Sequence, residues 1–230
     1  PRVAMAATES EYNATELRAM DFPDPVVVGI LRRQGRADAG ATAPRARAGP
    51  PRILFVGRGA PNKCQHDLVL ATAALADAGV DAELRLVGSW GANAAYRERC
   101  LRLARECGVA ERVHLCGSVS DEELAYEFAA ADVFVSMSEH EGFGVPLLEA
   151  MEAGLPIVAY SAGAVAETLG NAGLLLDDKA PSMVAESIAA VLAGNLAAQM
   201  ARGRAEQLDR HVPAAVEQRL TAFIEDLLTC

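Results

Sequence analysis

The chain has 230 residues, of which 51% are hydrophobic and 23% charged, so it can bury a full core. Its 31 acidic and 21 basic residues give a net charge of −10, which argues against general nucleic-acid binding because that function needs a basic face. No apolar run approaches the roughly 18 to 20 residues of a membrane-spanning helix, and the sequence shows no signal-peptide pattern.

Cysteine and histidine usage points to a protein without structural disulfides or zinc. The five cysteines are odd in number and include no C-x-x-C pair, so we expect reduced thiols in the cytoplasm. The four histidines lack the spacing of metal ligands, so we expect no zinc site. The length fits one large domain with appendages better than two full domains.

The first thirty residues predict a short set of elements that stands apart from the rest. Residues 1–6 have the composition of a strand that is entered midway, and the chain begins without a Met. A short helix is predicted over residues 10–17, and a buried strand over residues 26–30 follows the proline-rich turn at 22–25.

Residues 32–51 are rich in Arg, Ala, Gly and Pro and contain almost no large apolar residue. This composition is typical of a mobile linker between domains. The arginines would also suit an anion or a membrane surface, an alternative that the residues leave open. We favour the linker, which divides the chain into segments 1–31, 32–51 and 52–230.

From residue 52 onward, apolar runs of strand length alternate with segments of helical periodicity. The predicted strands are residues 53–56, 84–87, 113–115, 132–137, 156–159 and 174–176. The predicted helices are 67–78, 94–107, one that begins at Ser120, one that begins at Pro146, 182–193, 196–208 and 212–228. This order predicts an α/β fold with a doubly wound, Rossmann-like parallel sheet. Ligands of such sheets bind beyond the carboxyl ends of the strands.

Two local patterns in this region predict structure rather than chemistry. Ser120 and Glu123 form a capping box, which marks the start of a helix. Cys100 and Cys107 recur at helical spacing on the apolar face of helix 94–107, so core packing explains them better than redox pairing does.

The most informative stretch comprises residues 139–151, Glu-His-Glu-Gly-Phe-Gly-Val-Pro-Leu-Leu-Glu-Ala-Met. Its two glycines let backbone N–H groups approach a ligand, and Pro146 suits a first helical turn. Glu149 leans back toward the loop that carries Glu141. This predicted helix start would suit an anion, and the carboxylates would suit hydroxyls, as in a sugar phosphate. Taken alone, the two glutamates also fit exposed surface charges.

A second candidate element follows the strand at 53–56. Arg58 and Lys63 bracket a short loop that leads into a helix. A cation at a helix start is opposed by the helix dipole by a few tenths to about 1 kcal/mol, so Lys63 suggests an anion beyond that helix. Two solvated charges remain the alternative that the residues alone leave open.

The string at residues 138–151, continued at 154–159, resembles the retaining glycosyltransferases of family 4, which have the GT-B fold. Glu141 and Glu149 match the E-x7-E pattern of that family. The resemblance covers roughly residues 52–194 and a shorter piece near the N-terminus, and its motifs are highly specific.

The loop after the first of these strands resembles the G-R-x4-K element of the same family through Gly57, Arg58 and Lys63. The resemblance implies that the two cations hold the diphosphate of a sugar nucleotide. The family usually has Gly after this lysine, whereas this chain has Cys64, a departure that we interpret as the mark of a subfamily.

The resemblance implies a role for each matching residue. Glu149 would bind the ribose hydroxyls, Glu141 the donor sugar, and the backbone of Val119 the nucleobase, which leaves UDP or GDP open. His140 would touch the donor or orient the loop. The implied donor-binding residues are Gly57, Arg58, Lys63, Val119, His140, Glu141, Gly142, Phe143, Gly144, Val145 and Glu149, of which Glu141, Arg58 and Lys63 would serve catalysis.

The implied reaction is transfer of a hexose-type sugar from a UDP- or GDP-sugar to an acceptor hydroxyl, with retention and without a metal or other cofactor. Residues 1–31 resemble the end of the family's N-terminal acceptor domain, so we expect a fragment that binds donor but does not turn over. The acceptor (a sugar, a lipid-linked sugar or a small molecule) and a peripheral membrane contact would then involve the missing half. We expect no nucleic-acid partner.

Other functions on the same fold remain as alternatives. A phosphorylase would need a pyridoxal-phosphate lysine, and neither Lys63 nor Lys179 has such a setting. A sugar-nucleotide epimerase would need further acid–base residues. A non-catalytic nucleotide-sugar-binding domain would be expected to have lost the Glu and Arg/Lys sets, which this chain retains.

Overall fold

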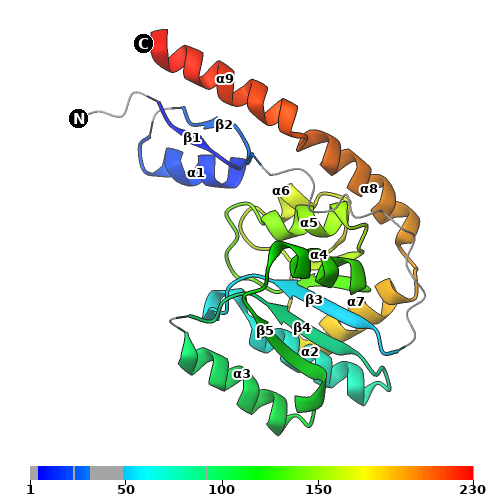
Figure 1. The fold of residues 1–230 in the computed structure, drawn as a ribbon. Coiled ribbons are helices and arrows are strands. Elements are labelled where there is room, and N and C mark those ends of the chain that lie inside the picture. Colours follow the sequence, from blue (N-terminus) through cyan, green and yellow to red (C-terminus); the bar gives the residue numbers. More distant parts are fainter. Residues whose placement is uncertain (1–4, 23, 32–48, 92, 230) are drawn as a thin grey trace.

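Six parallel strands form the central sheet of the computed structural model, in the order β5-β4-β3-β6-β7-β8. Figure 1 shows β3, β4 and β5 side by side. The structure describes residues 5–22, 24–31, 49–91 and 93–229. The strands are β3 (Arg52–Val56), β4 (Glu83–Val87), β5 (Val113–Gly117), β6 (Val133–Ser136), β7 (Ile157–Tyr160) and β8 (Leu174–Leu176). All five pairings in this sheet are parallel. The predicted doubly wound sheet is confirmed, and its chain order reverses between β3 and β6, as in a Rossmann fold.

Helices cover both faces of this sheet. The helices that follow β3 are α2 (Gln65–Asp77), α3 (Ala94–Glu106), α4 (Asp121–Ala130), α5 (Val145–Glu152), α6 (Val165–Leu169), α7 (Pro181–Leu192), α8 (Ala197–Arg210) and α9 (Pro213–Thr229), of which α9 lies away from the sheet (Figure 1). One core cluster joins the strands to α2, α3 and α7, and a second joins them to α4, α5 and α6. The chain therefore has the three-layer arrangement of an α/β domain.

The strands are apolar throughout because both faces of the sheet are buried. In β3, Ile53 and Phe55 enter the core cluster of α2, whereas Leu54 between them enters that of α5. In β6, Val135 enters the core cluster of α2 and Phe134 enters that of α5. This alternation is the period of two that a strand imposes on its side chains.

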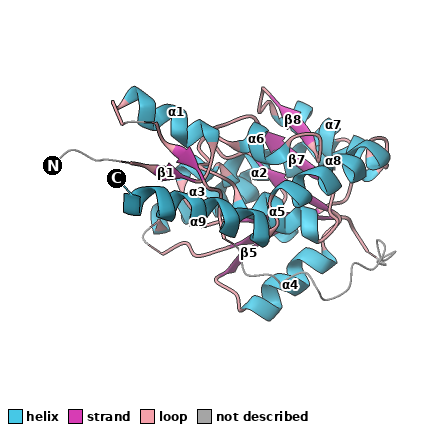
Figure 2. Ribbon diagram, turned by 90° about the horizontal axis from the view of Figure 1, so that it is seen from above, coloured by secondary structure: helices cyan, strands magenta, loops and turns pink. Residues whose placement is uncertain are grey.

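A smaller unit precedes the domain. It consists of β1 (Ala7–Thr8) paired in parallel with β2 (Val26–Val27), and of α1 (Glu11–Ala19) between them. Helix α9 runs beside this unit in both views (Figure 1, Figure 2), and the Nε of Arg219 donates to the carbonyl of Val28 at 3.2 Å. The two ends of the described chain therefore pack together.

Several predicted boundaries differ from the structure. Residues 1–4 of the predicted first strand lie outside the described residues, and residues 5 and 6 are not strand. The predicted strand at 26–30 is only two residues long, because β1 offers it a partner of that length. The short helix α6 was not predicted, since five residues are too few to show a period. Of the predicted linker, residues 32–48 lie outside the described residues, so the division into segments stays a prediction.

The capping box is confirmed. The Ser120 hydroxyl accepts from the N–H of Glu123 at 3.2 Å, and the Glu123 carboxylate accepts from the N–H of Ser120 at 2.7 Å. Both bonds satisfy N–H groups that have no partner within the helix.

We expect Ser120→Ala to lower the free energy of unfolding by about 1 kcal/mol, because the N–H of Glu123 loses its acceptor. Urea unfolding followed by circular dichroism measures this change. Ser182→Ala serves as the matched control, since Ser182 is exposed in the first turn of α7, a helix without a side-chain cap. Equal losses in the two variants would contradict a capping role for Ser120.

No single helix in the described part of the chain is long and apolar enough to cross a membrane. One pair, Pro181–Leu192 with Ala197–Leu228, passes the test of length and composition together but is bent by 91°. Its first member already buries Val184, Ile188 and Val191 in the core, which accounts for the apolar character of that helix.

Candidate functional site

The loops that carry the predicted site residues lie at the carboxyl ends of three strands. Residues 57–63 follow β3, residues 118 and 119 follow β5, and residues 137–144 follow β6. Because β3 and β6 are neighbours, their two loops meet where the strand order reverses. This position is the usual ligand site of an open α/β sheet.

The structure joins these two neighbouring loops through an ion pair. The Nζ of Lys63 lies 2.6 Å from Oε1 of Glu141 and donates to the carbonyl of His140 at 3.2 Å. The N–H of Glu139 donates to the carbonyl of Asn62 at 2.9 Å, which adds a backbone link. The side chains of Lys63 and Glu141 are 16% and 17% exposed, so the pair is largely sheltered but reachable. Two residues predicted from separate motifs are thus in direct contact.

The glycine loop leads into α5 as predicted. Gly144 has a φ of +85°, a conformation that disfavours any residue with a Cβ, and Val145 and Pro146 begin the helix. No side chain in the described residues caps this helix start. Pro146 has no N–H, and the N–H of Leu147 donates to the carbonyl of Gly144 at 2.9 Å, so the N–H of Val145 and the positive end of the helix would suit an anion.

Phe143 anchors this loop to the domain instead of facing a ligand. Its side chain is only 5% exposed, and its ring meets that of His211 edge-on at 5.3 Å. The Thr168 hydroxyl donates to its carbonyl at 2.6 Å. Phe143 is one of the predicted donor-binding residues, but it can therefore contact a donor only through its backbone.

Helix α1 covers the outer side of the same loop. The hydroxyl of Ser10 donates to the carbonyl of Gly142 at 2.7 Å, and the side-chain amide of Asn13 donates to it at 3.2 Å. The Tyr12 ring lies 6.3 Å from that of His140. His140 is exposed at this junction. The N-terminal unit is therefore part of the site's surroundings.

Arg58 is held through its backbone. Its carbonyl accepts from the side-chain amide of Gln65 at 2.9 Å, and the next residue, Gly59, accepts from Asn93 at 2.7 Å. The N–H of Gly57 donates to the carbonyl of Val87 at 2.9 Å, which fixes the loop to β4. With its backbone held, the exposed Arg58 side chain lies on the same loop as Lys63.

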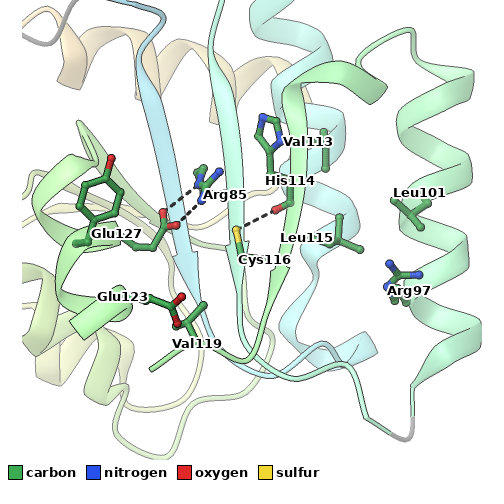
Figure 3. Close-up of a pocket in the computed structure, with 11 residues that line it drawn as sticks. Arg85, Arg97, Leu101, Val113, His114, Leu115, Cys116, Val119, Glu123 and Glu127 are labelled. Carbon is green, nitrogen blue, oxygen red and sulfur yellow. Dashed lines mark hydrogen bonds and ion pairs between the residues drawn. The ribbon is translucent and has the colours of Figure 1, made fainter. Parts of the chain in front are cut away.

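Val119 and Glu149 lie on elements further from the ion pair. Glu149 is partly buried on α5, the helix that the glycine loop starts. Val119 follows β5, which β4 separates from β3. Its side chain lines a pocket of about 620 Å³ along the edge strand, near Glu123 and between α3 and α4 (Figure 3).

That pocket is built around an ion pair of its own. The Nε of Arg85 donates to Oε2 of Glu127 at 2.9 Å, and a second contact joins the two groups (Figure 3). The hydrogen bond that Arg85 donates to Glu127 raises the pKa of Arg85. Of the predicted site residues only Val119 lines this pocket, so the pocket is not the predicted diphosphate site.

The sequence did not single out two residues that support the site. The N–H of Ala164 donates to the carbonyl of Glu141 at 2.8 Å, and a Cβ on the preceding Gly163 would lie 2.3 Å from that oxygen. Lys179, after β8, contacts both Asp67 and Glu139. The sequence held one hint of a role for Lys179: lysine is scarce in this chain, where almost all basic residues are arginines.

A Rossmann-like sheet with cations and an uncapped helix start at its switch point is an arrangement that suits an anionic ligand. The comparison with family models is more specific. Residues 42–207, well over half of the chain, match the model described as "Glycosyl transferases group 1". The chain belongs to that family.

Curated relatives of known activity cover most of this chain. A GDP-mannose-dependent alpha-(1-6)-phosphatidylinositol monomannoside mannosyltransferase of Mycobacterium tuberculosis is 32% identical over 74% of this chain and 43% of its own length. A D-inositol 3-phosphate glycosyltransferase of Streptomyces scabiei is 36% identical over 71% and 40%. A 2-deoxystreptamine glucosyltransferase of Streptomyces kanamyceticus is 34% identical over 80% and 49%. The chain therefore spans less than half the length of these relatives.

Solved structures confirm the predicted GT-B relationship. Sucrose-phosphate synthase from Thermosynechococcus elongatus superposes with a TM-score of 0.81 and 25% identity, over 98% of this chain and 58% of that one. HepE of Anabaena, solved with UDP and glucose, superposes with a TM-score of 0.81 and 19% identity, over 97% and 63%. The described fold is that of one part of a GT-B glycosyltransferase.

Proposed function

We propose that this chain is the donor-binding part of a retaining, family 4 glycosyltransferase that moves a sugar from a UDP- or GDP-sugar to an acceptor hydroxyl. The observation that carries the proposal is the contact between Lys63 and Glu141 at the switch point. It brings together one residue from each of the two motifs, G-R-x4-K and E-x7-E. The names of the relatives, which include mannosyl- and glucosyltransferases, support the reaction type.

In this proposal the diphosphate lies between the two cations and the N-terminal end of α5. An ammonium has three N–H bonds. Those of Lys63 reach Glu141 and the carbonyl of His140, which leaves one for a phosphate oxygen. Arg58 adds a second, always charged donor set. Fixed positive charge of this kind stabilises the negative charge that develops on the leaving diphosphate.

The two carboxylates bind the sugars on either side of the diphosphate. Glu141 contacts the transferred sugar, and Glu149 accepts from the ribose hydroxyls. The backbone near Val119 contacts the nucleobase. HepE was solved with UDP and with UDP-glucose, which supports a uridine donor, whereas the mycobacterial relative is a GDP-mannose-dependent enzyme. Both bases therefore belong in the test.

This chain covers 43% of the length of the mycobacterial enzyme. We propose that the acceptor binds to a domain that corresponds to the remaining part of that relative. We propose that the 230-residue chain binds the donor without transferring the sugar. The cysteines that the structure describes are all free, which supports a cytoplasmic setting. Steady transfer to an acceptor by this chain alone would contradict the proposal that it binds the donor without transferring the sugar.

A thermal-shift screen of UDP-, GDP- and ADP-sugars tests donor binding. A ligand at a hundred times its dissociation constant adds about 2.7 kcal/mol, which raises the Tm of a domain of this size by roughly 5 to 10 °C. We expect this shift with a UDP- or GDP-sugar, and a much smaller one in Glu149→Gln because the ribose loses its acceptor. Glu152→Gln, three residues further along the same helix, controls for the loss of charge. Shifts of equal size in wild type and Glu149→Gln would refute the proposed ribose contact, and the lack of any shift would refute donor binding.

A further inference from the structure

Lys179 is the second lysine of the chain, and it lies in the loop between β8 and α7. Its Nζ donates to Oε1 of Glu139 at 2.9 Å and to Sγ of Cys64 at 3.4 Å, and it lies 3.0 Å from Oδ2 of Asp67. The ammonium also sits 5.1 Å from the centre of the Tyr160 ring, within the range of a cation–π contact.

These contacts surround the ammonium. It forms hydrogen bonds to Glu139 and Cys64 and an ion pair with Asp67, and the side chain is only 18% exposed. Its polar contacts are all to neighbouring side chains of the two loops. Lys179 is therefore placed to act through its neighbours and not by touching a ligand.

Those neighbours belong to the two loops of the candidate site. Cys64 directly follows Lys63, and Asp67 lies in the first turn of α2. Glu139 stands on the loop after β6, two residues before Glu141. One side chain thus fastens the start of α2 to the loop that carries the first glutamate of the E-x7-E pattern.

The backbone at Cys64 shows why such a fastening is needed. Cys64 has a φ of +51°, in the left-handed region that few residues other than Gly, Asn and Asp adopt. Its Sγ accepts from Lys179 and contacts the carbonyl of Pro61 at 3.4 Å. These contacts hold a disfavoured turn directly after Lys63, and so fix where the Lys63 side chain begins.

Lys179 also balances charge. Asp67 and Glu139 bring two carboxylates close to loops that would receive an anion. Burial lowers the pKa of Lys179, but its bonds to Glu139 and Asp67 outweigh burial, so the net pKa is raised and the group stays charged. Its hydrogen bond and charge lower the pKa of Glu139. Without Lys179, both carboxylates would repel a diphosphate.

We propose that Lys179 is a positioning residue for the diphosphate half of the donor site. It holds the turn after Lys63 and the loop of residues 139–141 in fixed positions relative to each other. It also neutralises the carboxylates of Asp67 and Glu139. This inference rests on the proposed function for its ligand, but its structural half can be tested without one.

The first arm measures backbone amide exchange in the 230-residue chain. Lys179→Met is expected to speed exchange by about tenfold at residues 62–67 and 139–142, while the amides of β4 and β5 keep their wild-type rates. Arg112→Met is the matched control, because it removes the same charge from a pair with Asp81, 3.0 Å apart, at the amino ends of β4 and β5. Unchanged exchange in both loops, or a rise spread over the whole sheet, would overturn the positioning role.

The second arm measures the affinity for UDP and GDP by calorimetry at low salt. Lys179→Met should weaken binding by about tenfold, because a positive charge close to the ligand is lost. Adding Asp67→Asn should recover at least about half of that loss on a logarithmic scale, since one unbalanced carboxylate is removed. Lys179→Arg, which keeps the charge, should bind within about threefold of wild type.

The outcomes separate the two proposals. If wild type binds neither UDP nor GDP, the proposed function fails while the exchange arm still decides the positioning role. If wild type binds and Lys179→Met binds equally well, the inference about Lys179 fails and the proposed function stands. A loss that Asp67→Asn leaves untouched would overturn the charge-balancing part.

Discussion

Replacing Lys63 by Met is expected to weaken the binding of a nucleoside diphosphate by about a hundredfold, because a charge-assisted contact to a phosphate is lost. The same change also leaves the carboxylate of Glu141 without the ammonium that lies 2.6 Å from it. Lost attraction and new repulsion should therefore act together. Calorimetric titration with UDP and GDP measures the combined effect.

Two further variants divide that effect into its parts. Adding Glu141→Gln to Lys63→Met removes the repulsion and should raise the affinity a few-fold. The loss of affinity that remains is then due to the missing phosphate contact. Lys63→Arg keeps the charge and should retain most of the binding. Arg112→Met, at the other end of the strands, should bind as wild type does. If Lys63→Met bound within twofold of wild type, Lys63 would not contact the diphosphate.

Gly163→Ala is expected to reduce donor binding by at least about a hundredfold without touching a ligand-binding side chain. The new Cβ would lie 2.3 Å from the carbonyl oxygen of Glu141 and 3.0 Å from its nitrogen, so the backbone of Glu141 must move. Because this backbone fixes where the carboxylate begins, the contact with Lys63 should break. Titration with UDP and GDP measures the binding, and urea unfolding measures the stability.

Gly154→Ala provides the matched control for this experiment. Gly154 has a φ of +76°, close to the +59° of Gly163, but a Cβ there would meet nothing within 4 Å. Both variants should lose about 1 to 2 kcal/mol of stability from the left-handed backbone. Only Gly163→Ala should lose donor affinity, and a similar loss in Gly154→Ala would show that strain, not the contact with Glu141, is responsible.

The local sequence determined the order of the elements and where most of them begin. The alternation of apolar runs with helical periods predicted all six strands of the main sheet, since a sheet buried on both faces needs apolar residues throughout. Ser120 and Glu123 predicted a helix start because a capping box is a contact between neighbours in the chain. The E-x7-E and G-R-x4-K strings marked the two loops of the candidate site because each motif is contiguous.

Only the tertiary structure decided which of these loops meet and what holds them together. Lys63 and the carbonyl of His140 are 77 positions apart, and Lys179 and Cys64 are 115 apart. Such contacts depend on the order of strands in the sheet, which no local period encodes. The role of Gly163 was hidden for the same reason, because its close neighbour, Glu141, belongs to a different strand–helix unit. The sequence thus supplied the chemical groups, and the packing of the parallel strands supplied their distances.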